Sequence, residues 1–468
     1  MMMLELDTIL SETESVCPEC LARVPAVRVA RGENVYLKKA CPTHGFTQTI
    51  IWRGKPDFSS WVRAKSPARP ERPATDVARG CPFDCGLCPE HRIPSCCVLL
   101  EVTRRCDLSC SFCFASAGGA ASAAFELDLA TIGARLRALM ERTGGANLQL
   151  SGGEPCVRDD LPEIAALARD IGFTFIQVNS NGVRLGRDLE FARRLKESGV
   201  STVFLQFDGT RDDIHQVMRG RALQAHKERA IEHCGLAGLG VVLVPVIVPG
   251  VNADHLGEIV RFGLAHQPTV RGVHFQPVSY FGRYPQDPTD ADRITLPEIV
   301  AGLEAQTHGL VKIGHFQPAG AENALCSFNG NFVSLPDGSL RPLSQPKNAP
   351  ACCTPVGAPV ALEPANLAMA RARDFVARAW SAAPEAETAP AAGPSLGEWD
   401  VFLERMRTHQ FCISGMAFQD AWTLDLDRLR DCHIHIAEDE GACYPFCAYH
   451  LTDRHGRSLY RQQPVAVA

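Results

Sequence analysis

The chain has 468 residues, of which 46% are hydrophobic, so it is long enough for about three domains with hydrophobic cores. Its 47 Lys and Arg against 53 Asp and Glu give a net charge of −6, which argues against a nucleic-acid or anionic-membrane partner. The longest apolar run, at 238–251, is too short to cross a bilayer and contains two prolines. The N-terminus lacks the regions of a signal peptide, so we expect a cytoplasmic protein without a transmembrane segment.

The chain contains 20 cysteines, and most of them are clustered. A protein in a reducing compartment does not use so many thiols mainly as disulfides, so metal ligation is the expected role. The first cluster combines CPEC at 17–20 with CPTH at 41–44. These two turns predict one tetrahedral Zn or Fe site, and a redox-active thiol pair is the alternative for the CPEC turn. The predicted ligands are Cys17, Cys20, Cys41 and His44.

The first module and most of a Pro- and charge-rich connector at 62–79 make up residues 1–75. A second cysteine segment follows at 76–95. The sequence GCPFDCGLCPEH at 80–91 contains a CxxxCxxC triplet that follows a connector rather than a strand. We expect Cys81, Cys85 and Cys88 to hold an auxiliary iron–sulfur cluster, or as the alternative a structural zinc. The fourth ligand could come from His91, Cys96, Cys97 or a cysteine of the C-terminal region.

Residues 96–320 alternate β-rich runs with helical stretches, which predicts βα units and a parallel sheet. Apolar residues recur at helical spacing after the first strand, and Gly144 can end that helix in the left-handed conformation. Six consecutive units form a partial barrel or an open sheet, and the pattern alone does not choose. The predicted strands are 97–102, 147–150, 174–180, 202–207, 241–248 and 272–277, with further helices near 160–170, 187–198, 222–236 and 253–266.

A second CxxxCxxC triplet follows the first of these strands directly, in EVTRRCDLSCSFCF at 101–114. Cys106, Cys110 and Cys113 can bind three irons of a [4Fe-4S] cluster and leave the fourth iron open for chemistry. A zinc or electron-transfer site is the alternative, but such sites more often have four protein ligands. We therefore expect the catalytic cluster at this triplet.

Glycine-rich and polar segments follow the other strands, at the sheet edge where α/β folds bind ligands. In SGGEP, Gly152 and Gly153 allow close backbone approach to a ligand, and Glu154 can accept a hydrogen bond from an ammonium group. NSNG at 179–182, QFDG at 206–209 and QPVSYFGR at 276–283 lie at equivalent positions, with ordinary turns as the alternative. The further candidate residues are Asn179, Asn181, Gln206 and Asp208.

Residues 321–468 contain dispersed cysteines and an Ala- and Pro-rich stretch at 381–397 that predicts a loop. We expect this region to carry a second auxiliary cluster, although its ligands are far apart in sequence. The predicted quartet is Cys326, Cys412, Cys432 and Cys447.

Several of these segments resemble the radical SAM superfamily, and within it the branch of archaeal tetraether lipid synthase and 7,8-dihydro-6-hydroxymethylpterin dimethyltransferase-like proteins. The resemblance rests on CPEC with CPTHG, GCPFDCGLCPEH, TRRCDLSCSFCFA, SGGEP, LQFDG, VHFQPVSYFGR and the tail from MAFQDAW to YPFCAYH. It implies a partial (β/α)6 barrel with an N-terminal zinc-ribbon or rubredoxin-like knuckle and a C-terminal auxiliary iron–sulfur region. It also implies that S-adenosylmethionine (SAM) binds the open iron, with Phe112 in the cluster loop and the GGEP segment at its amino group.

The resemblance implies an enzyme that cleaves SAM to a 5′-deoxyadenosyl radical, abstracts hydrogen from an unactivated carbon, and forms a C–C bond or transfers a one-carbon group. The substrate would be a small molecule or a lipid, and flavodoxin or ferredoxin would supply electrons. A non-catalytic iron–sulfur electron carrier or sensor is the alternative, and SGGEP argues against it. A zinc-ribbon protein that binds nucleic acid is disfavoured by the negative charge.

Overall fold

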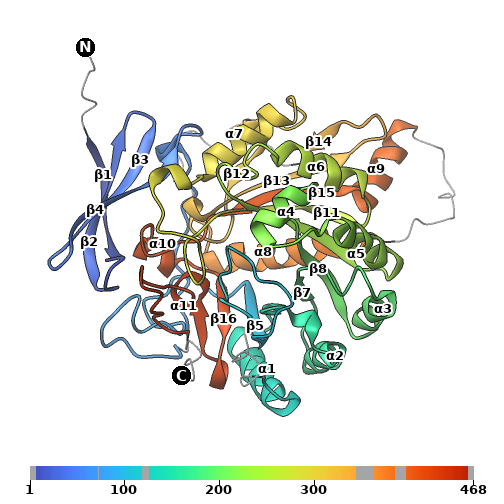
Figure 1. Cartoon of the computed structure of the whole chain (residues 1–468), viewed down its shortest axis with the longest axis horizontal. Coiled ribbons are helices and arrows are strands. Elements are labelled where there is room, and N and C mark those ends of the chain that lie inside the picture. The colour runs from blue at the N-terminus through green and yellow to red at the C-terminus, as the bar shows by residue number, and fades with distance from the viewer. Residues whose placement is uncertain (1–6, 72, 119–125, 344–361, 385–396, 462–468) are drawn as a thin grey trace.

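The computed structural model describes residues 7–71, 73–118, 126–343, 362–384 and 397–461. Its N-terminal part is an antiparallel sheet in the order β1-β2-β3-β4, at one end of the molecule (Figure 1). Cys17 and Cys20 follow β1, while Cys41 and His44 lie at the turn between β3 and β4. The strands are β1 (Thr8–Val16), β2 (Arg23–Arg31), β3 (Asn34–Cys41) and β4 (Gly45–Arg53).

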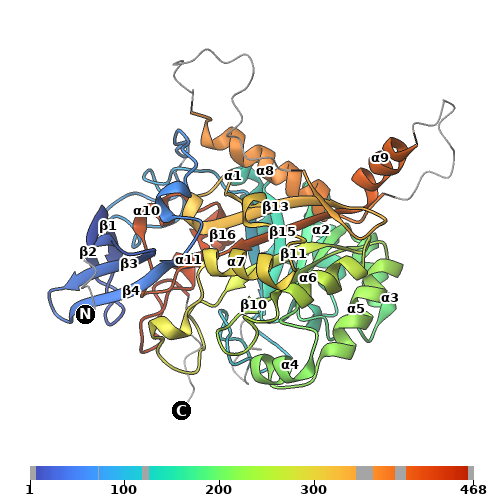
Figure 2. The same ribbon diagram turned by 90° about the horizontal axis from the view of Figure 1, so that it is seen from above.

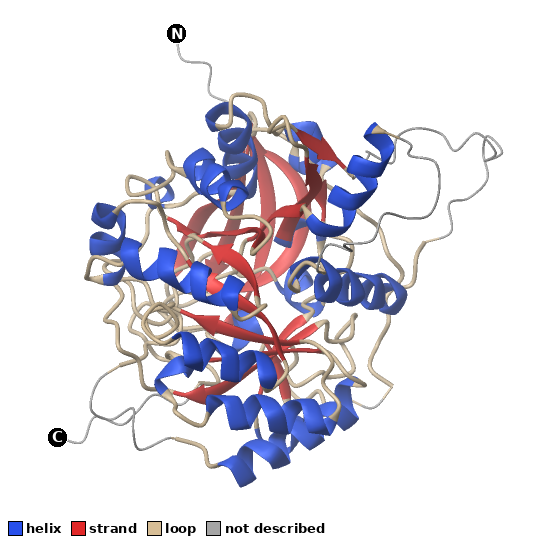
Figure 3. Cartoon of the chain, turned by 90° about the vertical axis from the view of Figure 1, so that its right-hand side faces the viewer, coloured by secondary structure: helices blue, strands red, loops and turns tan. Residues whose placement is uncertain are grey.

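The second sheet contains the six predicted βα strands, all parallel to their neighbours. It curves into a partial barrel with helices on its outer face (Figure 3), so the partial-barrel prediction is confirmed over the open sheet. The strands are β5 (Cys97–Thr103), β6 (Asn147–Gly152), β7 (Ile176–Ser180), β8 (Val200–Gln206), β9 (Gly240–Val244), β10 (Val246–Ile247) and β11 (Val270–Pro277).

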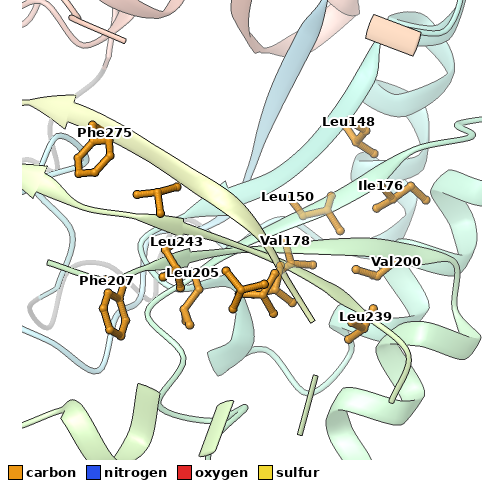
Figure 4. Close-up of a cluster of buried hydrophobic side chains, with 14 of the residues drawn as sticks. Leu148, Leu150, Ile176, Val178, Val200, Leu205, Phe207, Leu239, Leu243 and Phe275 are labelled. Atoms are coloured by element: carbon orange, nitrogen blue, oxygen red, sulfur yellow. The ribbon is translucent and has the colours of Figure 1, made fainter. Parts of the chain in front are cut away.

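The core lies between these strands and the helices outside them. Apolar side chains from neighbouring strands pack against one another there (Figure 4), and nearly all are removed from water. Figure 4 labels Leu148, Leu150, Ile176, Val178, Val200, Leu205, Phe207, Leu239, Leu243 and Phe275. The outer helices are α1 (Leu129–Thr143), α2 (Leu161–Ile171), α3 (Leu189–Glu197), α4 (Asp212–Arg219), α5 (Gln224–Leu236), α6 (Leu256–Ala265) and α7 (Leu296–Gln306).

C-terminal residues extend the barrel sheet at both edges. On one side β15 pairs in parallel with β11 and β13 pairs with β15, and on the other side β16 pairs in parallel with β5. The boundary expected at residue 320 therefore divides a continuous sheet. The remaining strands are β12 (Gln317–Pro318), β13 (Ser327–Ser334), β14 (Leu340–Pro342), β15 (Gln410–Met416), β16 (Ile434–Ala437) and β17 (Cys443–Pro445).

Helix α8 packs against the N-terminal ends of barrel strands (upper part of Figure 2). Asn147, the first residue of β6, donates to the Arg373 carbonyl, and Thr202 of β8 donates to the Trp380 carbonyl. Most of the predicted 381–397 loop lies outside the described residues. The last helices are α8 (Ala365–Trp380), α9 (Glu398–Thr408), α10 (Leu426–Arg430) and α11 (Phe446–Tyr449), and the 3-10 helices are Phe58–Ser60, Pro155–Val157, Asp290–Asp292, Ile313–His315, Ala324–Cys326 and Asp439–Gly441.

Candidate functional site

The cluster loop, residues 104–118, follows β5 at the carboxyl end of the barrel. Its cysteines Cys106, Cys110 and Cys113 are all partly accessible, and Cys113 and Phe112 line the barrel cavity. Burial raises the pKa of Cys106 to about 12, so an apolar environment without a bound cation favours its thiol form. A bound metal would reverse that preference, because metals bind thiolates.

Arg283, from the segment after β11, holds the cluster loop from across the barrel. Its backbone N–H donates to the Cys113 carbonyl and its carbonyl accepts from the Cys113 N–H, both at 2.9 Å. Its side chain donates to the carbonyls of Cys110, at 2.9 Å, and Ala117, at 3.2 Å. These four contacts hold the loop through its backbone and do not use the cysteine sulfurs.

The predicted GGEP segment packs directly on the start of the cluster loop. Gly153 donates to the Thr103 carbonyl at 2.9 Å, and Glu154 donates to the Arg105 carbonyl at 2.8 Å. A Cβ on Gly152 would lie 2.1 Å from the Thr103 carbonyl oxygen at the end of β5, and one on Gly153 would lie 2.2 Å from the Arg105 carbonyl oxygen of the cluster loop. The glycines thus allow contact between the two loops.

Glu154 is buried, and its carboxylate accepts three hydrogen bonds. Donors are the backbone N–H groups of Cys156, at 3.0 Å, and Asn181, at 2.6 Å, and the hydroxyl of Ser180, at 2.8 Å. Burial raises the pKa of Glu154, and these hydrogen bonds oppose the rise. The carboxylate links the ends of β6 and β7, and one of its roughly four acceptor positions is left for a ligand.

The other four predicted ligand-binding side chains separate into two groups. Asn179 and Gln206 line the barrel cavity. Asn181 instead donates to Asp107 of the cluster loop at 2.6 Å, and Asp208 forms a buried ion pair with Arg219. The structure therefore brings the first pair to the cavity wall and pairs Asn181 with the cluster loop and Asp208 with the last residue of α4.

Arg219, at the end of α4, is a residue that the sequence analysis did not identify. It lines the cavity beside Phe112, donates to the Phe112 carbonyl at 3.3 Å, and is held by Asp208 through two 2.7 Å hydrogen bonds. The only signal in the sequence was Asp208 itself, because a carboxylate at a strand end inside a barrel requires a cationic partner.

The cavity inside the barrel has a volume of about 470 Å³. It is bordered near the cluster loop by Phe112, Cys113 and Arg219, and near the other end of the barrel by α8. This size is within the range of small-molecule sites. Cys113 and Phe112 therefore lie on the wall of a cavity that can hold a substrate.

The four predicted N-terminal ligands lie together, with all ligand atoms within 4.8 Å of one another. His44 Nδ1 is 3.6 Å from Cys17 Sγ and 3.5 Å from Cys41 Sγ. Hydrogen bonds from the backbone N–H groups of His44 and Thr43 lower the pKa of Cys41 to about 6. Three sulfurs and one imidazole nitrogen fit a closed tetrahedral metal site.

Cys81, Cys85 and Cys88 are buried and line one small cavity together with His91 and Arg430. Of the proposed fourth ligands, Cys96 and Cys97 line the barrel cavity instead. His91 Nε2 donates to the Cys432 carbonyl at 2.7 Å, and burial lowers the His91 pKa to about 4. The neutral imidazole therefore has an unprotonated Nδ1, the form that binds metals.

The C-terminal quartet is divided in the structure. Cys326, Cys432 and Cys447 are near enough for their charges to affect one another's pKa, which burial raises in all three. Cys412 lies on β15 opposite Asn331 and lines the barrel cavity beside Trp380. The three-cysteine group contains no contribution from Cys412, because β15 runs away from Cys326 in an extended conformation.

Comparison with known proteins agrees with this geometry. The family model "Radical SAM superfamily" matches residues 100–263, and the model "HMPTM N-terminal zinc ribbon domain" matches residues 9–53. A curated protein from Methanocaldococcus jannaschii, 7,8-dihydro-6-hydroxymethylpterin dimethyltransferase, is 31% identical over 95% of this chain and 94% of its own length. The chain belongs to the radical SAM superfamily. Membership implies a [4Fe-4S] cluster and SAM, which fit the cysteines of the cluster loop.

Other similar proteins match a smaller share of this radical SAM protein. Fe-coproporphyrin III synthase from Methanosarcina barkeri is 34% identical over 40% of this chain and 45% of its own length. The hydrogenase maturase HydG from Carboxydothermus hydrogenoformans is 16% identical, with a TM-score of 0.37 over 46% of this chain and 52% of that chain. Among the described residues, no helix has the length and apolar character needed to span a membrane.

Proposed function

We propose that this radical SAM enzyme abstracts hydrogen from an unactivated carbon of a small molecule and forms a C–C bond or transfers a one-carbon group there. The observation that carries the proposal is that Cys113 and Phe112 line the same cavity as Asn179, Gln206 and Arg219. The name of the 31% identical relative, a dimethyltransferase, supports one-carbon transfer.

In this proposal Cys106, Cys110 and Cys113 hold the catalytic cluster. A [4Fe-4S] cluster supplies the electron that cleaves SAM into methionine and a 5′-deoxyadenosyl radical. Gly152 and Gly153 bring backbone close to the SAM amino group, and Glu154 accepts a hydrogen bond from it. Asn179 and Gln206 provide hydrogen-bonding groups on the cavity wall, and Asp208 positions Arg219 beside the cluster loop.

The test compares two triple variants of the anaerobically reconstituted protein with SAM and dithionite. Replacing Cys106, Cys110 and Cys113 with Ala should abolish formation of 5′-deoxyadenosine and remove about four irons per chain. The matched variant with Cys81, Cys85 and Cys88 replaced should still form 5′-deoxyadenosine in the first turnover. Persistence of the product in the first variant would reverse the roles of the two triplets, and its absence from the wild-type protein would favour a non-catalytic electron carrier.

We also propose two auxiliary clusters, one at the Cys81, Cys85 and Cys88 triplet and one at the group of Cys326, Cys432 and Cys447, with electrons supplied by a flavodoxin or ferredoxin. Cys81, Cys85, Cys88 and Cys447 are buried and Cys326 and Cys432 are partly buried, so each group offers three shielded thiols to a cluster whose fourth ligand is a further residue. Three [4Fe-4S] clusters predict about 12 cluster irons and as many sulfides per chain. Anaerobic analysis near four of each would contradict the auxiliary clusters without affecting the catalytic one.

For the N-terminal site we propose a structural zinc. The four ligands leave no open position, and the matching family model is a zinc ribbon. Cys41→Ala should therefore release one zinc per chain and disorder residues 8–53, as seen by limited proteolysis. An iron-loaded site whose zinc-substituted form folds but has lost multiple turnover would indicate an electron-relay role instead.

A further inference from the structure

The side chains that line the barrel cavity differ in chemistry along the barrel. We divide the cavity into three levels, from the cluster loop at the near end, through the strands in the middle, to α8 at the far end. Phe112, Cys113 and Arg219 border it near the cluster loop, where SAM is proposed to bind. The middle level is lined by inward-facing side chains of the strands, and the far level by α8 together with Arg63 and the segment 319–322. The last two levels are therefore available to a substrate, and their side chains indicate its chemistry.

Carboxamides line the middle level. Each comes from a strand residue that faces the interior, and Gln177 is 3% exposed with an Nε2 that has no hydrogen-bond partner among the described residues. A buried hydrogen-bond donor without a partner lowers the stability of the folded protein by about 1–3 kcal/mol. The carboxamide residues of this wall are Gln149, Gln177, Asn179, Gln206 and Gln276.

His274 adds an uncharged hydrogen-bonding group at the same level. Its Nδ1 lies 2.9 Å from the Ser414 hydroxyl, and burial lowers its pKa to about 4, so the imidazole is neutral near pH 7. Asn179 and Gln206 already hydrogen-bond to Ser151 and to Asp208 and Lys227, whereas a hydrocarbon chain in this part of the barrel would leave the Gln177 Nε2 without a partner. A molecule that offers an acceptor to Gln177 and further polar groups to the rest of this wall suits it better.

Two arginines line the far level of the cavity. The Arg63 guanidinium lies over Gly320, where a Cβ would be 3.4 Å from Nη1, and Arg63 has no ion pair within the described part of the chain. Arg371 of α8 is exposed and pairs with Glu363. Burial and the nearby charge of Arg371 both lower the pKa of Arg63, while Glu322 raises it. Arg371 thus has Glu363 as an ion-pair partner, whereas the Arg63 guanidinium has room for a bound anion as its partner.

We propose that the substrate is an anionic small molecule with a hydrogen-bonding body, whose phosphate or carboxylate group binds between Arg63 and Arg371 while its body contacts the carboxamides. This inference rests on the proposed function, because it places the reacting carbon near Cys113. Guanidinium groups bind phosphate and carboxylate oxygens through paired hydrogen bonds. A lipid phosphate could bind the arginines, but its hydrocarbon chains could not accept a hydrogen bond from Gln177.

The test measures binding to the anaerobically reconstituted protein by calorimetry, without dithionite. The three probes are 7,8-dihydro-6-hydroxymethylpterin, which the relative's name contains, its phosphate monoester, and octyl phosphate. We expect the phosphate ester to bind about 10-fold to 100-fold more tightly than the alcohol, because hydrogen bonds to charged groups contribute about 1.5–3 kcal/mol. Octyl phosphate should bind at least about tenfold more weakly than the ester, since its chain offers no acceptor to the Gln177 Nε2.

Variants identify the groups responsible. Arg63→Gln and Arg371→Gln should each remove most of the advantage of the ester over the alcohol, whereas Arg378→Gln, an exposed position of α8 that does not line the cavity, should keep it. Gln177→Leu should weaken binding of both pterins and strengthen that of octyl phosphate. The last variant tests the polar body independently of the arginines.

Three outcomes would overturn the proposal. Equal affinity for alcohol and ester would refute the anion site, and tightest binding of octyl phosphate would refute the polar body and favour a lipid. Absence of binding by all three probes up to millimolar concentration would refute both parts. Formation of 5′-deoxyadenosine, measured separately with SAM and dithionite, shows whether the proposed function itself holds, so the two failures can be distinguished.

Discussion

At the scale of single residues, contact between two loops decides which side chains are tolerated near the cluster. Gly153 packs against the Arg105 carbonyl and donates to the Thr103 carbonyl. The backbones of the two segments are therefore in direct contact, with no space for a side chain between them. This arrangement explains a requirement for glycine through space rather than through an unusual backbone angle. The cost of a methyl group at this position therefore measures how tightly the GGEP segment and the cluster loop are coupled.

We predict that Gly153→Ala lowers the rate of SAM cleavage by about tenfold or more. Moving one of the two loops needs to raise the activation barrier by only about 1.4 kcal/mol for a tenfold loss of rate. The new Cβ would be 2.2 Å from the Arg105 oxygen, so one of the loops must move. Gly314→Ala is the matched control, because a Cβ there meets no atom within 4 Å. The measurement is 5′-deoxyadenosine formation, and equal rates in both variants would show that the loop contact is not needed.

Asp420 is a second residue whose environment leads to a prediction. It is fully buried and binds Arg293 at 2.8 and 3.2 Å and the Tyr280 N–H at 2.9 Å. Burial alone would raise the pKa of the Asp420 carboxyl, but the charge and hydrogen bonds of Arg293 hold it below its ordinary value. The ionised carboxylate therefore stabilises the folded chain where the C-terminal segment meets the end of the barrel.

We predict that Asp420→Asn lowers the free energy of unfolding by about 3–5 kcal/mol at pH 7, because it leaves the Arg293 charge buried without a partner. The folded pKa is lowered, so the wild-type contribution is complete above the ordinary carboxyl pKa of about 3.9 and is lost as pH falls toward the folded value. Denaturant unfolding at several pH values should show the difference between the two proteins shrinking only below about pH 4. A difference in unfolding free energy between the two proteins that does not change with pH would contradict an ionised Asp420 in the folded state.

At the scale of elements, the predictable parts are those with local signals. All six predicted strands occur, and Gly144 ends α1 with a φ of 62° as expected. The predicted strand at 241–248 is divided into β9 and β10, because Pro245 lacks the N–H that would continue the ladder and only its carbonyl pairs, with the Gln276 N–H. Helix α4 was not predicted, and it supplies Arg219.

The elements that escaped prediction depend on distant partners. β15 and β16 join opposite edges of the sheet although both follow residue 409, and nothing within either segment specifies a parallel neighbour far away in the sequence. The candidate site divides in the same way. The cysteine triplets and SGGEP are contiguous and were predictable, whereas the pairing of Asp208 with Arg219 and the position of Arg63 beside Arg371 result from folding.

At the scale of the whole molecule, the two ends of the described chain meet. The N-terminal sheet packs against residues 420–430, next to α10 (Figure 2). Arg28 of β2 binds both oxygens of Asp425, at 2.7 and 2.9 Å, and Lys39 of β3 donates to the Ala421 carbonyl at 2.7 Å. The zinc ribbon therefore stabilises the segment that leads to Cys432 and Cys447.

We predict that Arg28→Met removes this contact with the C-terminal segment and leaves the metal site of the ribbon intact. Asp425 is 2% exposed, so loss of its partner should lower the free energy of unfolding by about 3–5 kcal/mol. Arg31→Met is the matched control on the same strand, because Arg31 pairs with the more exposed Asp7 and such pairs contribute about 0–1 kcal/mol. Zinc should remain bound in both variants, while proteolysis near residues 420–430 and loss of iron should increase only in Arg28→Met. Equal stability of the two variants would show that the ribbon folds beside the C-terminal segment without supporting it.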